Sequence, residues 1–249
     1  MGEVAIFRSH LIPMPHQIKL LKKYEIADGT MAFEFGKPEG YEFVAGQATD
    51  WTLIDPKETD AEGNSRSFSL ACAPSEPVLR FATRMRDTAF KRCMRAMPIG
   101  GEISIDDPWG DFVLNAGDPS QAVFLCGGIG VTPFYSMIKE ATIKHDPRNL
   151  LMFFSNKTPQ DAPFRGEINE LDDMSASIQV IETMVDADTS WTGERGFIDP
   201  PMLERQIRDL TKPTYYIAGP PQMVAAMNKM LLGAGVSSEH VKLDEFSGY

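Results

Sequence analysis

The sequence predicts a chain in two parts, an antiparallel β domain followed by a parallel α/β domain, on three observations of its patterning. Up to about residue 114, short apolar segments alternate with polar residues between turn signals, as at 31–35 and 102–105. A turn-rich stretch follows at 115–120. Beyond it, apolar runs alternate with segments whose apolar residues recur at helical spacing. We therefore place one domain at 1–115 and a second at 120–249.

Strands at the spacing of the first domain are typical of a small antiparallel barrel or sandwich. One helix is expected among them. It follows Asp87 and Thr88, carries Phe90, Met94 and Met97 on one side, and stops before a proline.

In the second domain, strands and helices alternate. Strands are expected at 122–125, 150–154, 178–181 and 214–217, and helices at 133–144, 164–171, 200–209 and 221–233. Such alternation is typical of a parallel sheet with helices on its faces. Because ligands bind outside the carboxyl ends of parallel strands, the loops after residues 125, 154 and 217 are expected to converge.

Composition and charge exclude several classes of function. The 249 residues are 43% hydrophobic, which is ordinary for a soluble globular protein. The net charge of -11, without any basic run, argues against nucleic-acid binding. No apolar run approaches the ~18 residues of a membrane span, and the N-terminus carries no secretory signal pattern. We expect a cytoplasmic protein.

The cysteines and histidines predict no metal site. Cys72, Cys93 and Cys126 are odd in number, widely spaced and without a CxxC pair, so they encode neither a disulfide framework nor an iron–sulfur or zinc site. The four histidines also lack metal-ligand spacing. A reducing compartment fits this usage best.

A glycine-rich stretch at 126–133 links the first strand of the second domain to a helix. Gly127, Gly128 and Gly130 let backbone amides approach a ligand, and Pro133 suits the first turn of a helix whose free amides attract anions. We interpret the stretch as a phosphate-binding loop, with an ordinary tight turn as the alternative. It departs from the standard dinucleotide fingerprint, because a proline replaces the third glycine and 155–157 supplies no acid for a ribose.

A second unusual segment is the tetrad Arg66-Ser67-Phe68-Ser69 in the first domain. Strand alternation puts Arg66 and Phe68 on one side and Ser67 and Ser69 on the other. A cation, an aromatic ring and a hydroxyl this close together suit a phosphorylated, planar heterocycle. An edge strand with a solvated arginine would have the same pattern.

The motifs of the two domains occur in a recognisable order. From the N-terminus they are Gly46-Gln47, Arg66-x-Phe68-Ser69, Pro108-x-Gly110-x-Phe112, the stretch 127–133, Ala218-Gly219-Pro220-Pro221-x-Met223 and Glu245-Phe246. In this order they resemble the ferredoxin-NADP reductase superfamily over nearly the whole chain. The resemblance implies a six-stranded antiparallel FAD-binding barrel, a Rossmann-like nicotinamide-nucleotide domain, and hydride transfer from NADH or NADPH to the flavin N5 atom.

The resemblance also assigns residues to FAD. It implies that Arg66 neutralises the pyrophosphate, that Phe68 packs on the isoalloxazine or ribityl chain, and that Ser69 hydrogen-bonds near N5. These roles suit the chemistry of each side chain. Arg66 offers a planar fork of donors, Phe68 an aromatic surface, and Ser69 a hydroxyl that both donates and accepts. Further flavin contacts are implied for Ser67, Arg84, Met85 and Thr88, with Asp87 as an alternative that only caps the helix.

For the nicotinamide nucleotide, the resemblance implies a second set of residues. Those expected to hold the pyrophosphate are Gly127, Gly128, Gly130, Thr132 and Pro133, and those bordering the nicotinamide are Gly219, Pro220 and Met223. The polar residues Ser155, Asn156 and Lys157 suit the nucleotide phosphate and ribose. Ala218 stands where relatives often carry a cysteine.

The carboxyl end resembles the family's flavin-covering aromatic. Phe246 aligns best, Tyr249 is a competing candidate, and an unstructured tail is a further alternative. Ser69, Glu245 and Phe246 are the predicted catalytic residues.

The sequence thus predicts a flavin-dependent oxidoreductase that passes electrons from NAD(P)H to a separate acceptor protein such as a ferredoxin, a flavodoxin or an oxygenase component. A non-catalytic flavin-binding or electron-transfer subunit and a binding module for another nucleotide are the alternatives. The sequence leaves open the choice between NADH and NADPH, the acceptor, the direction of electron flow and the oligomeric state.

Overall fold

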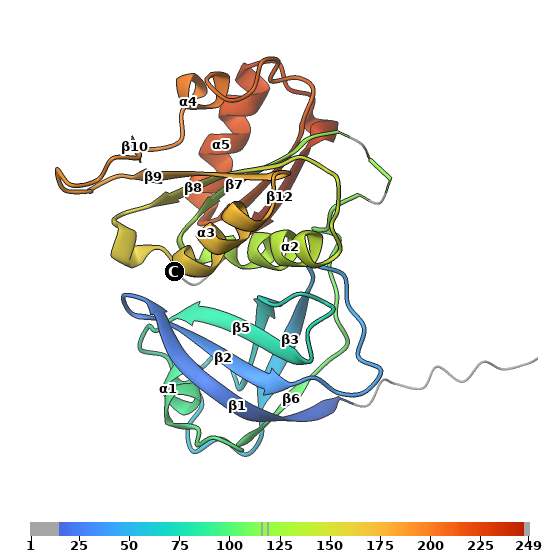
Figure 1. Ribbon diagram of the computed structural model, residues 1–249. Helices are drawn as coiled ribbons and strands as arrows, with labels where there is room; N and C mark the ends of the chain where they lie inside the picture. The colour runs from blue at the N-terminus through green and yellow to red at the C-terminus, as the bar shows by residue number, and fades with distance from the viewer. Residues whose placement is uncertain (1–14, 116, 119, 247–249) are drawn as a thin grey trace, which may run out of the picture.

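The computed structural model describes residues 15–115, 117–118 and 120–246, which form two sheets stacked one above the other (Figure 1). The lower sheet belongs to the first half of the chain and the upper sheet to the second half. Helices of the second half lie between the two sheets and beyond the upper one.

The lower sheet is a six-stranded antiparallel barrel. Its strands are β1 (His16–Ala27), β2 (Thr30–Gly36), β3 (Ala48–Leu53), β4 (Ser65–Ser69), β5 (Val78–Arg84) and β6 (Glu102–Ile105), in the order β4-β3-β6-β1-β2-β5. The segment after β4 closes the sheet, because the amide of Ala71 donates to the carbonyl of Arg80 on β5 at 2.7 Å. The predicted six-stranded antiparallel fold is confirmed.

Aromatic side chains fill the barrel, since alternate residues of each strand face inward. Trp51 is fully buried and its ring centroid lies 4.6 Å from that of Phe81. Phe68 stacks on the other side of the same core, 4.5 Å from Phe81 with the rings almost parallel. Phe68 therefore links the barrel core to the surface of β4.

Among the described residues of this half there is one helix, α1 (Ala89–Ala96), as the sequence predicts. Thr88 is the N-cap residue, and its hydroxyl accepts a hydrogen bond from the amide of Lys91 at 3.4 Å. Asp87 does not cap the helix and instead pairs with Arg92. Phe90 is buried against the barrel core.

The upper sheet is entirely parallel, with the order β10-β9-β8-β7-β11-β12. Its strands are β7 (Ala122–Gly127), β8 (Leu150–Asn156), β9 (Ile178–Met184), β10 (Glu194–Arg195), β11 (Thr214–Gly219) and β12 (Val241–Glu245). Its helices are α2 (Thr132–Ile143), α3 (Arg165–Met174), α4 (Pro200–Glu204) and α5 (Pro221–Gly233), with the short turns η1 (Gly128–Val131), η2 (Pro159–Asp161) and η3 (Ser238–His240). Figure 1 shows α2 and α3 on the face toward the barrel and α4 and α5 on the opposite face.

Three elements differ from the sequence prediction, one of them the two-residue strand β10, which was not expected. The helix expected at 200–209 ends at Glu204, and the Asp209 side chain accepts the amide hydrogen of Thr211 in a local turn that competes with helix. The segment 241–245, for which no strand was expected, is strand β12 and pairs with β11. Its alternation of partly buried and exposed residues suits a sheet edge, a pattern too short to stand out in the sequence.

The two halves share one packed core. Small barrel residues, among them Ala71 and Ala82, lie in the same cluster of buried side chains as Phe134 and Tyr135 of α2. Alanines let the helix approach the barrel closely. The exact domain boundaries at 115 and 120 stay a prediction.

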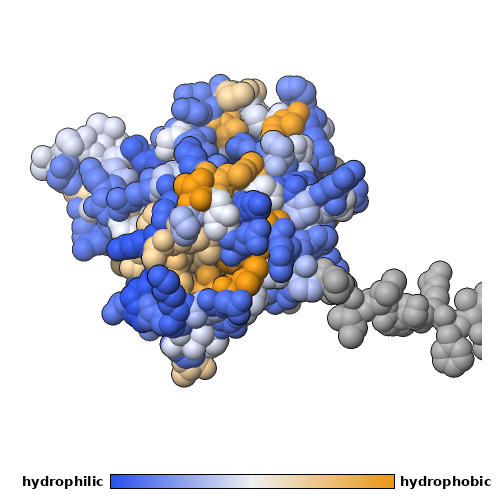
Figure 2. Space-filling model, turned by 90° about the horizontal axis from the view of Figure 1, so that it is seen from below, coloured by the Kyte–Doolittle hydropathy of each residue, from blue (hydrophilic) through white to orange (hydrophobic). Residues whose placement is uncertain are grey.

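The exposed apolar residues do not form a single large face. Large examples such as Leu21, Ile99 and Phe197 are spread over both halves. Seen from below, hydrophilic residues surround several apolar areas (Figure 2). Within the described part of the chain, no helix has the length and apolarity needed to cross a membrane.

Candidate functional site

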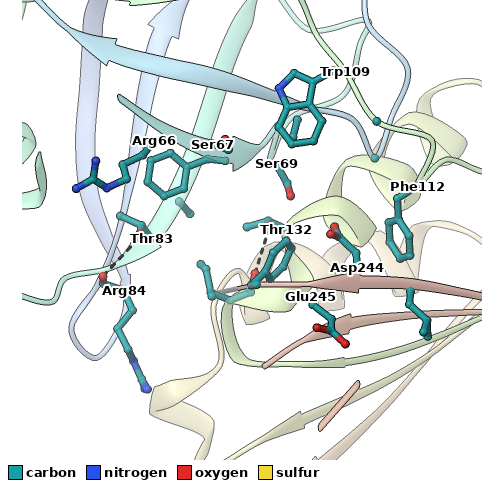
Figure 3. Close-up of a pocket in the computed structure, with 18 of the residues that line it drawn as sticks. Arg66, Ser67, Ser69, Thr83, Arg84, Trp109, Phe112, Thr132, Asp244 and Glu245 are labelled. Atoms are coloured by element: carbon teal, nitrogen blue, oxygen red, sulfur yellow. Dashed lines mark hydrogen bonds between the residues drawn. The ribbon is translucent and has the colours of Figure 1, made fainter. Parts of the chain in front are cut away.

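A cavity of about 460 Å³ lies between the barrel and the parallel sheet, and residues of both halves line it (Figure 3). Nine of the predicted site residues meet there: Arg66, Ser67, Phe68, Ser69, Arg84, Thr88, Thr132, Glu245 and Phe246. They come from β4, β5 and the start of α1 on one side, and from α2 and β12 on the other. The fold thus brings segments far apart in the sequence to one cavity.

Ser69 is the buried member of the tetrad. Its hydroxyl points into the cavity, toward the side formed by Thr132 and β12 (Figure 3). Among the described residues, no hydrogen-bond partner is found for that hydroxyl. Because this hydroxyl faces the cavity and can both donate and accept, it is well placed to bond a ligand atom.

Arg66 is already engaged by acids of its own domain. Its Nη2 atom lies 2.9 Å from Asp60 Oδ1 and 2.9 Å from Glu62 Oε2. Its Nη1 atom donates to the carbonyl of Gly63 at 3.2 Å. A phosphate at this position therefore competes with two carboxylates for the guanidinium.

Lys91, which the sequence interpretation missed, is a second cation at this end of the cavity. Burial lowers its pKa, and the nearby charges of Arg86 and Arg66 lower it further. In the described part of the chain, its ammonium group has no hydrogen bond or ion pair. Lys91 lies one turn after the helix cap Thr88, and that spacing is the signal that could have found it.

The loops after β7, β8 and β11 converge at the carboxyl ends of the strands. Gly127 pairs with Ser155, and Gly130 lies against the chain at Ala218. A Cβ atom on Gly130 would be 2.4 Å from the Ala218 carbonyl oxygen. Gly128, by contrast, has a φ of +53° and open space where its Cβ would be. Close packing thus requires Gly130, while Gly128 leaves its backbone accessible to a ligand.

Asn156 and Lys157 differ in how they are placed. Asn156 is buried, and neither its amide nitrogen nor its amide oxygen has a hydrogen-bond partner among the described residues. Lys157 is exposed, and its Nζ atom lies 3.9 Å from Asp186 Oδ2. Asn156 therefore has unused bonding capacity beside the glycine loop.

Some predicted residues lie outside the cavity. Met85 packs on the barrel core. The loop residues at the strand ends form a neighbouring group: Gly127, Gly128, Gly130, Pro133, Ser155, Asn156, Lys157, Gly219, Pro220 and Met223. Tyr249 lies outside the described residues.

Other lining residues, beyond Lys91, were not among the predicted site residues. They include Gly46, Thr83, Trp109, Gly110, Asp111, Phe112, Ile129, Leu243 and Asp244. Gly46, Gly110 and Phe112 belong to motifs that support the family resemblance, so motif order was the signal for them. Asp244 depends on β12, which the sequence did not reveal as a strand.

Asp244 is the less exposed of two neighbouring carboxylates on β12. Burial raises its pKa to about 6, and the negative charge of Asp111 contributes to the rise. In Figure 3 its carboxylate is on the cavity side, whereas that of Glu245 points away from Ser69. Asp244 therefore joins Glu245 as a candidate acid at the cavity.

We predict that Asp244 makes folding less favourable as pH rises. A carboxyl of pKa about 6 in the folded state, against roughly 3.9 unfolded, binds more protons folded, so stability falls from pH 4 to pH 7. Asp244→Asn removes this loss, so it raises the free energy of unfolding at pH 7. We expect an increase of about 2 kcal/mol, which is less than the full pKa difference gives because Asp244 is partly exposed to solvent. Urea unfolding of both proteins at pH 4 and pH 7 measures it.

Asp111→Asn provides the control for that experiment. Removal of the Asp111 charge is expected to lower the pKa of Asp244 only in part, because burial is the larger cause of its rise. The loss of stability between pH 4 and pH 7 should therefore become smaller in Asp111→Asn but should not disappear. An equal difference in unfolding free energy between Asp244→Asn and the unmodified protein at both pH values would refute the assignment.

Comparisons with known proteins agree with this geometry. Residues 124–229 match the family model described as an oxidoreductase NAD-binding domain. The F subunit of the Na(+)-translocating NADH-quinone reductase of Haemophilus influenzae is 28% identical over 232 residues, covering 86% of this chain and 56% of that protein. The chain spans little more than half the length of the curated relatives it matches first.

Solved structures share the fold. The flavohem-like FAD/NAD-binding domain of nitric oxide dioxygenase from Vibrio cholerae superposes with a TM-score of 0.81 at 16% identity, over 92% of this chain and 98% of that one. A ferredoxin NADP+ reductase from Neisseria gonorrhoeae, with bound FAD and NADP, superposes with a TM-score of 0.79 at 20% identity, over 93% of this chain and 98% of that one.

The fold is that of two-domain flavoprotein oxidoreductases, and its second half matches an oxidoreductase NAD-binding domain. These comparisons support the resemblance to the ferredoxin-NADP reductase-like superfamily that the order of the motifs predicts.

Proposed function

We propose that this chain transfers hydride from NADH or NADPH to FAD and passes the electrons to a separate acceptor protein. The observation that carries the proposal is the cavity shared by both domains. Ser69 of the barrel, Thr132 of α2 and Phe246 after β12 all line it. A flavin on the barrel side and a nicotinamide on the sheet side would meet there.

The residues present fit FAD. Lys91, which has no partner among the described residues, and the nearby Arg66 give the cavity a cationic end for a diphosphate. The amide of Ala89 at the start of α1 is bonded to Asp60 at 3.0 Å, so an acidic group already occupies that helix N-terminus. Phosphate binding would displace this carboxylate or bind beside it at Lys91.

The chain's own groups orient the reactants. When bound, the flavin and nicotinamide supply the hydride chemistry themselves, so the protein contributes position and electrostatics. Ser69 and Phe246 line the cavity, where the Ser69 hydroxyl would hydrogen-bond the flavin edge and Phe246 would cover the flavin. Asn156 and the amides of the glycine loop bind the nicotinamide nucleotide. Holding the flavin and the nicotinamide at the right distance and orientation supplies most of the rate acceleration.

We propose NADH as the preferred donor. Lys157 is the cation of the loop after β8, and Asp186 lies 3.9 Å from it and offsets part of its charge. A 2′-phosphate would meet this acid, whereas the 2′-hydroxyl of NADH would not be repelled. The proposed compartment is the cytoplasm, with which the three unpaired cysteines agree.

The acceptor is proposed to be a separate protein. The chain has three cysteines in all, too few for a four-cysteine iron–sulfur cluster of its own. Trp109 and Leu243 line the cavity and are 48% and 43% exposed, so an approaching protein would contact them beside the flavin. A ferredoxin, a flavodoxin or an oxygenase component has the required chemistry.

The visible spectrum of the purified protein tests the proposal. We expect a yellow protein that bleaches within seconds under anaerobic NADH, and more slowly under NADPH. Yellow colour that persists with both donors would identify a non-catalytic flavin-binding subunit. No colour after addition of FAD would identify a module for another nucleotide.

A further inference from the structure

A buried arginine joins the barrel to the parallel domain behind the cofactor cavity. Arg80 on β5 is 3% exposed. Within the barrel, its Nε atom donates to the Ala71 carbonyl at 2.8 Å and its Nη1 atom to the Tyr24 hydroxyl at 2.7 Å. Its Nη2 atom crosses to α2 and donates to the Tyr135 hydroxyl at 2.8 Å. Nη1 also lies 3.3 Å from Glu167 on α3.

Two glutamates near the Arg80 guanidinium also bind the tyrosines that it contacts. Glu34 of the barrel lies 3.6 Å from Nη1 and accepts a hydrogen bond from Tyr24 at 2.6 Å, while Glu167 accepts one from Tyr135. Burial raises the pKa of both tyrosines well above the usual range. The hydroxyls thus stay protonated donors, and the guanidinium stays charged. The cluster is a permanent link between the domains that does not respond to physiological pH.

Further contacts run along the same helix. Three side chains of α2 bind the segment between β4 and β5: Lys139 to Glu76 at 2.6 Å, Ser136 to the Cys72 carbonyl at 2.5 Å, and Glu140 to the Ser75 hydroxyl at 2.8 Å. These bonds hold α2 against the barrel over two of its turns. Arg80 is the most buried cation among them.

Both linked elements continue into the cofactor cavity. Ala82, two residues after Arg80 on β5, lines the barrel side of the cavity. Thr132, about one turn before Tyr135 on α2, lines the opposite side. Because packed interiors transmit small shifts, a change at the Arg80–Tyr135 contact changes the separation of Ala82 and Thr132.

We propose that Arg80, Tyr135 and Glu167 are positioning residues that set the distance and angle between the flavin and nicotinamide sites. None of the three lines the cavity proposed to hold the cofactors, and they act by holding α2 against β5. The inference rests on the proposed function for its kinetic consequence, while its structural consequence can be measured separately.

Tyr135→Phe is the sharpest variant, because it removes one hydroxyl and keeps the ring that stacks on Phe164 at 4.6 Å. Arg80→Met is the stronger variant. In anaerobic stopped-flow experiments, we expect FAD affinity within about twofold of the unmodified protein. Hydride transfer from NADH should slow by about 10-fold in the first variant and about 100-fold in the second, with weaker long-wavelength charge-transfer absorbance.

Arg165→Met is the matched control. It breaks an arginine–glutamate pair with Glu182 inside the parallel domain, at 2.7 Å, and leaves the interdomain contact intact. Its rate of hydride transfer should be unchanged. An unchanged rate in both Tyr135→Phe and Arg80→Met, or a parallel loss of FAD affinity and rate, would overturn the proposal.

A spectroscopic distance measurement makes the outcome independent of turnover. Spin labels at Glu39→Cys on the barrel and Glu204→Cys on α4, in a Cys93→Ser background, should give a broader distance distribution when Arg80→Met is added. An unaltered distribution would overturn the proposal. If the unmodified protein binds FAD but neither NADH nor NADPH reduces it, the proposed function is wrong. The distances between the spin labels then test by themselves whether Arg80 holds the two domains together.

Discussion

Gly130→Ala is expected to destabilise the protein by about 3 kcal/mol and to abolish binding of the nicotinamide nucleotide. The added Cβ would be 2.4 Å from the Ala218 carbonyl oxygen and 2.7 Å from the Cα atom of Gly219. Both contacts are with backbone, so no side-chain rotation relieves them. Because η1 would have to move away from β11, the loop that follows β7 would lose its shape. Urea unfolding and titration with NAD+ measure the two effects.

Gly166→Ala is the control for this prediction. Gly166 is in α3, and a Cβ there meets no atom within 4 Å. The substitution replaces a poor helix former by a good one, so it should be neutral or stabilise by up to about 1 kcal/mol. A Gly130→Ala protein with unchanged stability and unchanged affinity for NAD+ would contradict the close packing of η1 on β11.

Lys91→Glu is expected to weaken FAD binding by about 100-fold while leaving riboflavin binding nearly unchanged. Lys91 lines the cavity without a partner in the described part of the chain, and Arg66 is shared with Asp60 and Glu62. The lysine is thus the cation most available to a diphosphate. FAD carries that group and riboflavin does not, so fluorescence titrations with both flavins separate phosphate binding from ring binding.

Lys229→Glu makes the same change of charge on the exposed surface of α5. Its effect on FAD affinity should stay within about twofold at moderate ionic strength, because screening weakens distant charges. If Lys91→Glu lowered the affinities for FAD and riboflavin equally, the lysine would support the fold of the site and would not bind the diphosphate.

Most of the architecture was predictable because it follows from local periodicity. The alternation within the first half and the alternation of strands with helices in the second identify both sheets. The α1 prediction held because Thr88, Phe90 and Met94 form a cap and one apolar face. β12 escaped prediction because its five residues are weakly apolar and become a strand only by pairing with β11.

The candidate site was predictable where a motif is contiguous and not where it depends on neighbours. The tetrad at 66–69 and the glycine stretch are each continuous in sequence, and the sequence brought both to attention. Lys91 and Asp244 gain their importance from surroundings that no local pattern encodes. One becomes a partly buried cation near two arginines, and the other a partly buried acid near Asp111.

Sequence alone was sufficient to establish the two-domain class, the order of the motifs and the residue types offered to a flavin and a nicotinamide nucleotide. Tertiary structure decided the rest: that Arg66 is shared with two acids, that Gly130 serves packing against β11, and that a buried Arg80 joins the domains. The physical reason is that hydrogen bonds, ion pairs and steric contacts act over a few ångströms. Residues far apart in the chain acquire them only after the two sheets have packed together.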